Sequence, residues 1–264
     1  MDNRPNPARI GKGCVACGRC VNECPMSAIS IHKGTRAVID EEKCVGCGRC
    51  AAGCPADVIQ CDRAVMAAKT RKTKSSWYDY LWIFSTVYLA LGFFNILFAW
   101  IGLICFITPL LISLFGGGKA YCNKYCGRGQ LFELLGARFG LSRKKSPPRF
   151  LRSPWFRYGF LTFFMVMFLL MIYNTRLVFS GATLKQVVTL LWVFKLPWSW
   201  AYTARVAPWA AQFAFGFYGV MLTSTVLGLI TMALFRPRSW CVYCPMGTMT
   251  QGICILKNRW QKNM

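Results

Sequence analysis

The chain has 264 residues, of which 55% are hydrophobic, with a mean hydropathy of +0.37 and a formal net charge of +23. This composition is too apolar for an ordinary soluble domain, so a membrane protein is the first class to test. The charge does not favour nucleic-acid binding, because no run outside the membrane-flanking loops alternates basic with aromatic residues, and we interpret it as membrane topology.

The chain divides near residue 76 into two predicted domains. Residues 1–76 are polar and cysteine-rich, whereas residues 77–264 contain apolar runs of 18 or more residues without charge. The N-terminal stretch MDNRPNPARIGKG lacks the apolar segment of a secretory signal, so we expect the first domain to be cytoplasmic. In that reducing compartment, fifteen cysteines indicate metal or cluster ligands rather than disulfides.

The first domain contains an internal repeat at an offset of thirty residues. CVACGRCVNECP, starting at Cys14, aligns with CVGCGRCAAGCP, starting at Cys44, and each has the pattern C-x2-C-x2-C-x3-C-P. Three thiolates on a tight turn can reach three irons of one cubane, while the fourth points to the other half. Zinc is the alternative, because C-x2-C pairs also bind that ion.

At these residues the sequence resembles bacterial two-cluster ferredoxins, which implies a small α+β fold with two 4Fe-4S clusters. The resemblance covers residues 10–62. It implies two ligand sets, each completed by the fourth cysteine of the other half: Cys14, Cys17, Cys20 and Cys54; and Cys44, Cys47, Cys50 and Cys24. Cys61 aligns with Ile31, which favours a small core residue, and we expect the single histidine, His32, at the surface.

A basic link at residues 62–76 precedes the first long apolar run, Leu81 to Phe115. These 35 residues without charge would measure about 52 Å as one helix, against a hydrocarbon core of about 30 Å. Two short helices joined near residues 95–100 fit better, although one tilted helix is an alternative. Residues 156–173 and 210–235 supply two further spans, which gives a membrane α-helical domain of about four transmembrane helices.

The segment between the last two spans has an apolar stretch of only eight residues, Val187 to Phe194, which cannot cross a bilayer. Several tryptophans near it predict an interfacial position, with a re-entrant hairpin as the alternative. Residues 118–157 carry ten Lys/Arg against one Glu, so we expect this loop to be cytoplasmic. With four spans, the first domain and the C-terminus share that side, giving a multi-pass protein of the cytoplasmic membrane.

Two cysteine pairs follow apolar segments in the second domain. Cys122 and Cys126 are four residues apart, and Cys241 and Cys244 are three apart, so each pair shares one face of a helical turn. Two membrane crossings separate the two cysteine pairs, whether the first apolar run forms one helix or two. Both cysteine pairs therefore face the same side of the membrane. Together they offer four thiolates, the number that a third cluster or a tetrahedral metal needs. The alternative is unliganded packing cysteines.

Other side chains near these pairs have less specific interpretations. The basic residues Lys119, Lys124, Arg128, Arg236 and Arg238 would favour thiolates and an anionic cluster. Cys105 is expected to face lipid or to pack within its helix, and Cys254 is a candidate spare ligand.

Here the sequence resembles membrane iron–sulfur proteins of the NapH and NosR type, which carry two C-x3-C-P motifs at the cytoplasmic ends of about four helices. The resemblance covers residues 80–250 loosely and the two motifs closely. It implies electron transfer between quinols or soluble reductants and a partner at the membrane. Two differences affect the motifs: Gly127 replaces proline in the first, and the second is C-x2-C-P.

The sequence therefore predicts an electron-transfer protein that passes electrons between a cytoplasmic carrier and a membrane partner or quinone. It lacks a Rossmann fingerprint, a P-loop or a Ser/His/Asp arrangement, so a subunit of a redox complex is favoured over a stand-alone enzyme. The predicted partners are membrane lipid, a redox protein or subunit, and quinone, without nucleic acid. One alternative is a metal reductase or maturation factor, for example for copper; another is a redox sensor.

Overall fold

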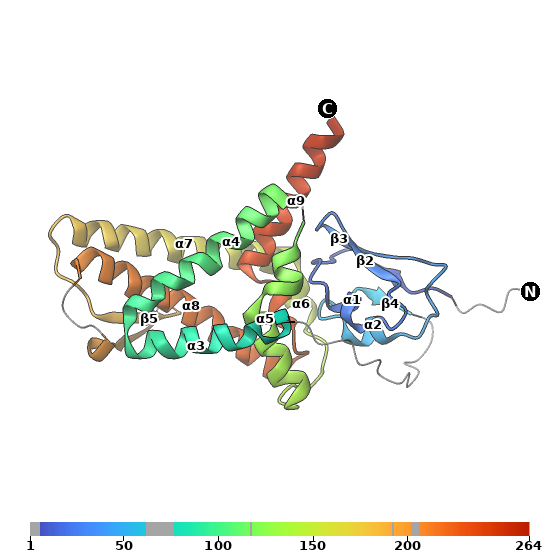
Figure 1. The fold of residues 1–264 in the computed structure, drawn as a ribbon, viewed down its shortest axis with the longest axis horizontal. Helices are drawn as coiled ribbons and strands as arrows, with labels where there is room; N and C mark the ends of the chain where they lie inside the picture. Colours follow the sequence, from blue (N-terminus) through green and yellow to red (C-terminus); the bar gives the residue numbers. More distant parts are fainter. Residues whose placement is uncertain (1–5, 62–76, 117, 192, 202–205, 264) are drawn as a thin grey trace, which may run out of the picture.

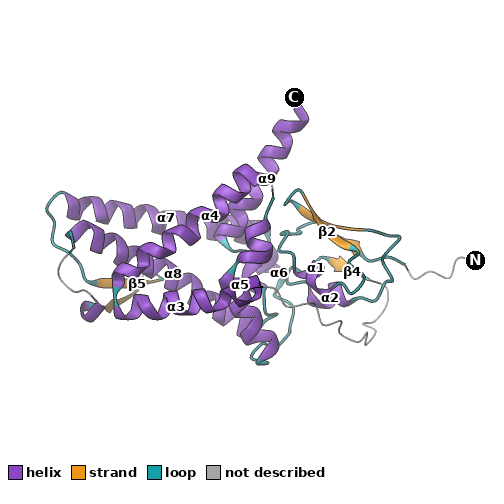
Figure 2. Cartoon of the chain, in the orientation of Figure 1, coloured by secondary structure: helices purple, strands orange, loops and turns teal. Residues whose placement is uncertain are grey.

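The computed structural model describes residues 6–61, 77–116, 118–191, 193–201 and 206–263, and the basic link at 62–76 lies outside this part. Figure 1 shows a bundle of long helices with a small domain docked at one of its ends. Figure 2 shows that helices make up most of the chain, with short strands in the small domain and at the opposite end of the bundle.

The small N-terminal domain has two antiparallel strand pairs and two short helices. Strand β1 (Arg9–Ile10) pairs with β4 (Ile59–Gln60), and β2 (Ile29–His32) pairs with β3 (Arg36–Ile39). The pairing of β1 with β4 joins the two ends of the domain, which keeps both cysteine repeats within one core.

The sequence repeat is also a repeat of backbone conformation. Helices α1 (Arg19–Glu23) and α2 (Arg49–Gly53) follow Gly18 and Gly48, whose φ angles are 75° and 73°. This left-handed conformation is strained for side chains with a Cβ, so glycine permits the tight turn after the second cysteine of each motif. The third cysteine of each motif then lies in the helix, and the fourth follows its last residue.

The first apolar run is divided at Asn95, as the sequence predicted. Helix α3 (Leu81–Phe94) ends there, and α4 (Ala99–Gly116) begins after the short 3-10 turn η2 (Ile96–Phe98). Asn95 has an extended backbone, and its side-chain oxygen accepts a hydrogen bond of 3.0 Å from Leu97 N. This local cap starts a new helix and lets the chain reverse direction.

Within the described residues, three helical segments are long and apolar enough to cross a membrane: residues 96–116, α7 (Pro154–Phe179) and α8 (Pro208–Leu234). Both α7 and α8 begin with proline, which fits the first turn because its N–H would have no helical partner. Helix α3 has 14 residues, about 21 Å, and is shorter than a hydrocarbon core. The length criterion therefore gives three spans, one fewer than expected.

The short apolar stretch at 187–194 forms part of a β-hairpin. Strands β5 (Val187–Leu190) and β6 (Phe194–Pro197) pair antiparallel and are followed by η5 (Ser199–Ala201). Val188 is fully buried, and the indole N–H of Trp200 donates to Phe93 O at 3.1 Å. The hairpin therefore closes the α3–α4 end of the bundle, away from the N-terminal domain (Figure 1).

The other end of the bundle is built from the last helix, α9 (Pro245–Asn263), and from short connecting elements: η1 (Trp77–Tyr80), η3 (Tyr121–Tyr125), α5 (Gly127–Glu133), η4 (Leu134–Arg138), α6 (Arg149–Arg152) and η6 (Ser239–Val242). One hydrophobic cluster joins this end to the N-terminal domain, with Val15 and Ile29 on one side and Phe132, Trp240 and Tyr243 on the other. The two domains therefore share a hydrophobic core.

Candidate metal centres

Two cavities in the N-terminal domain are each enclosed by four cysteines. One is lined by Cys14, Cys17, Cys20 and Cys54, and the other by Cys24, Cys44, Cys47 and Cys50, and each has a volume of about 20 Å³. Each set takes three thiols from one repeat and the fourth from the other, which is the grouping that the ferredoxin resemblance implies. We name them the inner cavity, which includes Cys17, and the outer cavity, which includes Cys47.

Backbone amides stabilise some of these sulfurs. Ala28 N lies 3.3 Å from Cys24 Sγ, and Ala37 N lies 3.4 Å from Cys14 Sγ. Amide donors to cluster sulfurs are one of the means by which a protein holds a cluster and sets its potential. The donor set in both cavities therefore fits a 4Fe-4S cluster.

Burial determines the protonation of the thiols when no metal is bound. It raises the pKa of Cys50 to about 11 and raises the pKa values of Cys20 and Cys54. These side chains are therefore neutral thiols at pH 7 on their own, and iron must displace their protons when a cluster assembles.

The arrangement does not match a mononuclear zinc site. No three His, Cys, Asp or Glu side chains in the described part of the chain are close enough to hold a single metal ion. The four thiols of each cavity surround a space instead of converging on a point. This favours a multi-iron cluster over the zinc alternative.

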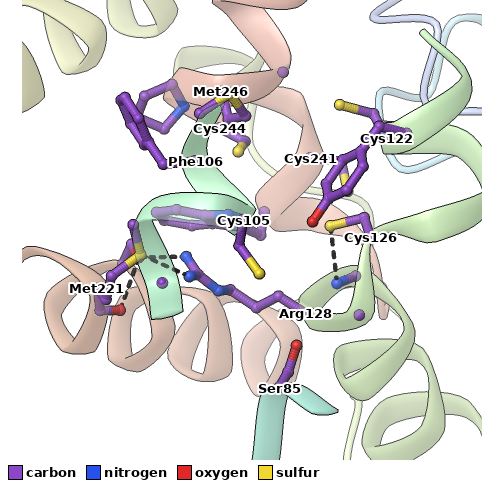
Figure 3. Close-up of a pocket in the computed structure, with 18 of the residues that line it drawn as sticks. Ser85, Cys105, Phe106, Cys122, Cys126, Arg128, Met221, Cys241, Cys244 and Met246 are labelled. Atoms are coloured by element: carbon purple, nitrogen blue, oxygen red, sulfur yellow. Dashed lines mark hydrogen bonds between the residues drawn. The ribbon is translucent and has the colours of Figure 1, made fainter. Parts of the chain in front are cut away.

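The two cysteine pairs of the helical domain line one common cavity of about 130 Å³, which we call the membrane cavity (Figure 3). Cys122 lies in η3 and Cys126 caps α5, where its sulfur accepts a hydrogen bond of 3.4 Å from Gly129 N. Cys241 lies in η6, and Cys244 directly precedes the first residue of α9. The structure thus brings together two cysteine pairs from distant parts of the sequence.

The glycine that replaces proline in the first motif has a packing reason. A Cβ at Gly127 would lie 2.4 Å from the backbone oxygen of Leu81 and 2.6 Å from Ser85 Oγ. Only glycine lets the start of α5 approach the start of α3 this closely. The contact brings Cys126 into the membrane cavity.

Two cations line the membrane cavity. Lys119 is 4% exposed and donates to Val15 O at 2.8 Å, whereas Arg128 donates to Ser224 Oγ at 2.5 Å and to Met221 Sδ at 3.0 Å. Among the described residues, neither cation has a carboxylate partner within salt-bridge distance. Both would therefore favour an anionic centre, as the sequence predicted for them.

The four membrane cysteines are half-buried, and the surrounding protein affects the ionisation of three of them. Burial raises the pKa of Cys122 to about 11, opposed in part by Lys119, and raises the pKa values of Cys241 and Cys244. Because their pKa values are raised, these thiols are neutral when no metal is bound, and they would become ligands only when iron replaces their protons. The donor set again fits a cluster.

Of the other predicted basic neighbours, Arg236 contacts the N-terminal domain, Arg238 pairs with a carboxylate of α5, and Lys124 lies at the surface. Arg236 hydrogen-bonds Cys54 O and lies 3.3 Å from the carboxylate of Asp57, and Arg238 lies 2.6 Å from that of Glu133. Lys124 is exposed. Arg236 therefore serves chiefly to hold the two domains together.

The structure places the remaining cysteines differently from one another. Cys105 lines the membrane cavity, a position that the interpretation as a lipid-facing or packing residue did not include. Cys254 is buried beneath Gly34 and is not among the residues that line the three cavities. Cys61 donates to Gly46 O at 3.2 Å as part of the core, and His32 is exposed.

Sequence reasoning missed two features of the site. Cys17 lines both the inner and the membrane cavity, and Tyr88 lines the membrane cavity from α3. The docking that brings Cys17 to the second cavity has no signature in the repeat itself. Tyr88 belongs to an apolar run, where a single tyrosine resembles an ordinary packing residue.

Family models match both halves of the chain. Residues 13–58 match a 4Fe-4S dicluster domain, and residues 98–148 and 218–263 match a 4Fe-4S binding domain, so the class is that of iron–sulfur proteins. The dicluster match lies in the N-terminal domain, and the 4Fe-4S binding domain model matches twice in the helical part that follows. No curated protein and no solved structure matched, and the resemblance to the NapH and NosR type remains a prediction.

Proposed function

We propose that this protein is a membrane-anchored electron-transfer protein, acting as a subunit of a redox complex. A two-cluster domain of ferredoxin-like fold lies on the cytoplasmic side, and α3 joins the three longer helices as a fourth, shorter span. The cysteine pairs then lie at the cytoplasmic end of the bundle, where Cys122, Cys126, Cys241 and Cys244 hold a third cluster.

The observation that carries the proposal is the position of Cys17. This thiol lines the inner cavity and also the membrane cavity. A ligand of the inner cluster therefore contacts the space of the membrane centre. The 4Fe-4S clusters supply one-electron chemistry. The protein sets the order of the centres along the proposed electron route, from the outer cavity through the inner cavity to the membrane cavity.

A second set of contacts keeps this order fixed. The Gln251 amide on α9 donates to Cys14 O at 3.0 Å and to Thr35 O at 2.6 Å, and it accepts from Arg157 at 2.6 Å. Arg157 also donates to Thr248 Oγ1 at 2.8 Å, one turn after Cys244. The network links the backbone at a ligand of the inner cavity to the helix that begins at the membrane thiols.

Stepwise reduction followed by electron paramagnetic resonance tests the order. We expect the signal of the inner cluster to show magnetic coupling to both others, and the outer cluster to couple only to the inner one. Coupling of the membrane centre to the outer cluster alone, or to neither, would contradict the proposed route.

A further inference from the structure

Arg128 holds a positive charge inside the membrane cavity. It lies near the start of α5, two residues after Cys126. Its guanidinium donates to Ser224 Oγ at 2.5 Å and to Met221 Sδ at 3.0 Å, and both acceptors belong to α8. Figure 3 shows the side chain reaching from the Cys126 side of the cavity to Met221. The charge is therefore held in place by a long apolar helix.

The hydrogen-bond partners of Arg128 are neutral, which distinguishes it from the arginines that join the two domains. In the part of the chain that the structure describes, no carboxylate lines the cavity, and none lies within salt-bridge distance of this guanidinium. Five arginines of the N-terminal domain and its interface do have a carboxylate partner: Arg19, Arg49, Arg152, Arg236 and Arg238. A poorly solvated cation without a counter-ion is costly, so the charge of Arg128 requires an anion that these side chains do not supply.

A metal centre at the four membrane thiols would be that anion, because thiolate ligands give an iron–sulfur centre a negative charge. Burial raises the pKa of Cys244, and the charges of Arg128 and Lys119 oppose that rise, so both cations act on this thiol. Lys119 also donates to Val15 O, in the loop that lines the inner cavity. The hydrogen bonds of Arg128, in contrast, all go to the helical domain.

We propose that Arg128 sets the reduction potential of the membrane centre. Reduction adds one electron, and with it one negative charge, to a centre that is already anionic. A fixed cation in the same cavity stabilises the reduced form more than the oxidised form. The apolar surroundings act in the opposite direction, because they disfavour any added charge. Arg128 therefore raises the potential and lets the membrane centre accept an electron from the inner cluster.

The inference rests on the proposed function, which places a cluster at the four membrane thiols. In the electron-transfer step, the inner cluster loses one electron and the membrane centre gains it. No bond forms or breaks, and no proton is required. The guanidinium stays protonated throughout, so its effect on the potential does not change with pH near neutrality.

The test is a redox titration of the purified, cluster-loaded, full-length protein, followed by electron paramagnetic resonance. Arg128→Met removes the charge and keeps an unbranched side chain. We expect it to lower the reduction equilibrium constant of the membrane centre about tenfold, which is about 60 mV for a one-electron couple. Arg128→Lys keeps the charge and should stay near the wild-type potential. Arg176→Met removes an exposed charge from the far end of α7 (Figure 1) and should leave all three potentials unchanged.

A second pair of variants neutralises Arg128 without removing it. Ser224 accepts a hydrogen bond from the guanidinium and lines the cavity. Ser224→Asp would therefore supply the missing carboxylate, whereas Ser224→Asn would supply a neutral side chain of the same size. We expect Ser224→Asp to lower the potential as Arg128→Met does, and Ser224→Asn to leave it near the wild-type value. This pair gives the answer if Arg128→Met does not retain iron at the membrane thiols.

The outcomes separate this inference from the proposed function. An unchanged potential in Arg128→Met, or equal shifts in Ser224→Asp and Ser224→Asn, overturns the role of the charge. A shift in Arg128→Lys as large as that in Arg128→Met overturns it too, because the charge is kept. In these cases, magnetic coupling through all three clusters would leave the electron route intact. A wild type without iron at the membrane thiols would instead remove the proposed function and this inference with it.

Discussion

Arg19 of the N-terminal domain forms an ion pair with Glu133 of α5, and the same carboxylate accepts from Arg238 at 2.6 Å. Glu133 thus binds α1, which follows Cys17 and Gly18, to the segment that leads to Cys241. The carboxylate is partly shielded, with 27% of its side chain exposed, and Arg238 is only 7% exposed. The charge at Glu133 is therefore part of the contact that holds the inner and membrane cavities together.

Replacing Glu133 with glutamine should loosen this contact. Arg238 loses its carboxylate in a poorly solvated place, whereas Arg19 keeps its ion pair with Glu23, and we expect the change to cost about 1 to 3 kcal/mol. The measurement is thermal bleaching of the visible absorbance of the clusters, with Glu42→Gln as a control that removes the same charge from an exposed turn. Equal melting temperatures for the two variants would mean that Glu133 does not support the docking.

Gly34 should be required for two reasons: its left-handed backbone in the turn, and the close contact of the N-terminal domain with the helical domain at this residue. Its φ is +70°, and a Cβ there would lie 2.8 Å from both Cys254 Sγ and Lys119 N. Gly140 has nearly the same φ, +71°, and a Cβ at that residue would meet no atom within 4 Å. Both alanine variants carry the strain of a left-handed backbone, about 1 kcal/mol, so a larger loss of stability in Gly34→Ala reports the contact between the domains. Similar losses in both variants would show that docking tolerates a Cβ at residue 34.

Replacing Gly127 should affect the membrane centre alone and leave the two ferredoxin clusters in place. Gly127→Ala forces the start of α5 away from Leu81 and moves Cys126, so we expect loss of about four irons with both ferredoxin clusters retained. Gly129→Ala is the matched control on the same helix, because its Cβ would meet Cys126 Sγ at an ordinary 3.5 Å. The measurement is the iron content of the two purified variants. Unchanged iron in Gly127→Ala would contradict the idea that close packing at Gly127 positions Cys126 in the membrane cavity.

The grouping of the ferredoxin cysteines predicts that the fourth cysteine of each repeat binds the cluster of the other repeat. Cys54→Ser should remove the inner cluster and its coupling to the membrane centre, whereas Cys24→Ser should remove the outer cluster and leave that coupling intact. Electron paramagnetic resonance of the reduced variants reports both effects. The opposite pattern would mean that each repeat keeps its own fourth cysteine.

Local sequence patterns were sufficient for the local features of this fold. The repeat around Cys14 and Cys44 predicted two sites that exchange their fourth cysteine, and polar Asn95 marked the break in the first apolar run. Counting crossings predicted that Cys122 and Cys241 face the same side, and they line one cavity. Each of these inferences depends only on spacing, periodicity or hydropathy.

The features that escaped prediction depend on contacts between distant segments. Cys105 resembles any small residue of an apolar helix, and its place in the cavity that Arg128 also lines follows from how α4 and α5 both pack against α8. The hairpin at 187–197 pairs residues whose apolar stretch alone indicated only an interfacial segment. Docking through Glu133 and Gly34 requires both domain surfaces to be known, and no spacing in either domain encodes it.

Iron and sulfide counting on anaerobically purified protein, wild type and Cys241→Ala, tests most directly whether the membrane thiols hold a cluster next to the inner one. We predict about twelve irons in the wild type and about eight in the variant, with the two ferredoxin signals unchanged. Cys254→Ala serves as the control, since this buried thiol does not line the membrane cavity, and should keep all twelve. About eight irons in both wild type and Cys241→Ala would contradict a third cluster and, with it, the route from Cys17 into the membrane domain.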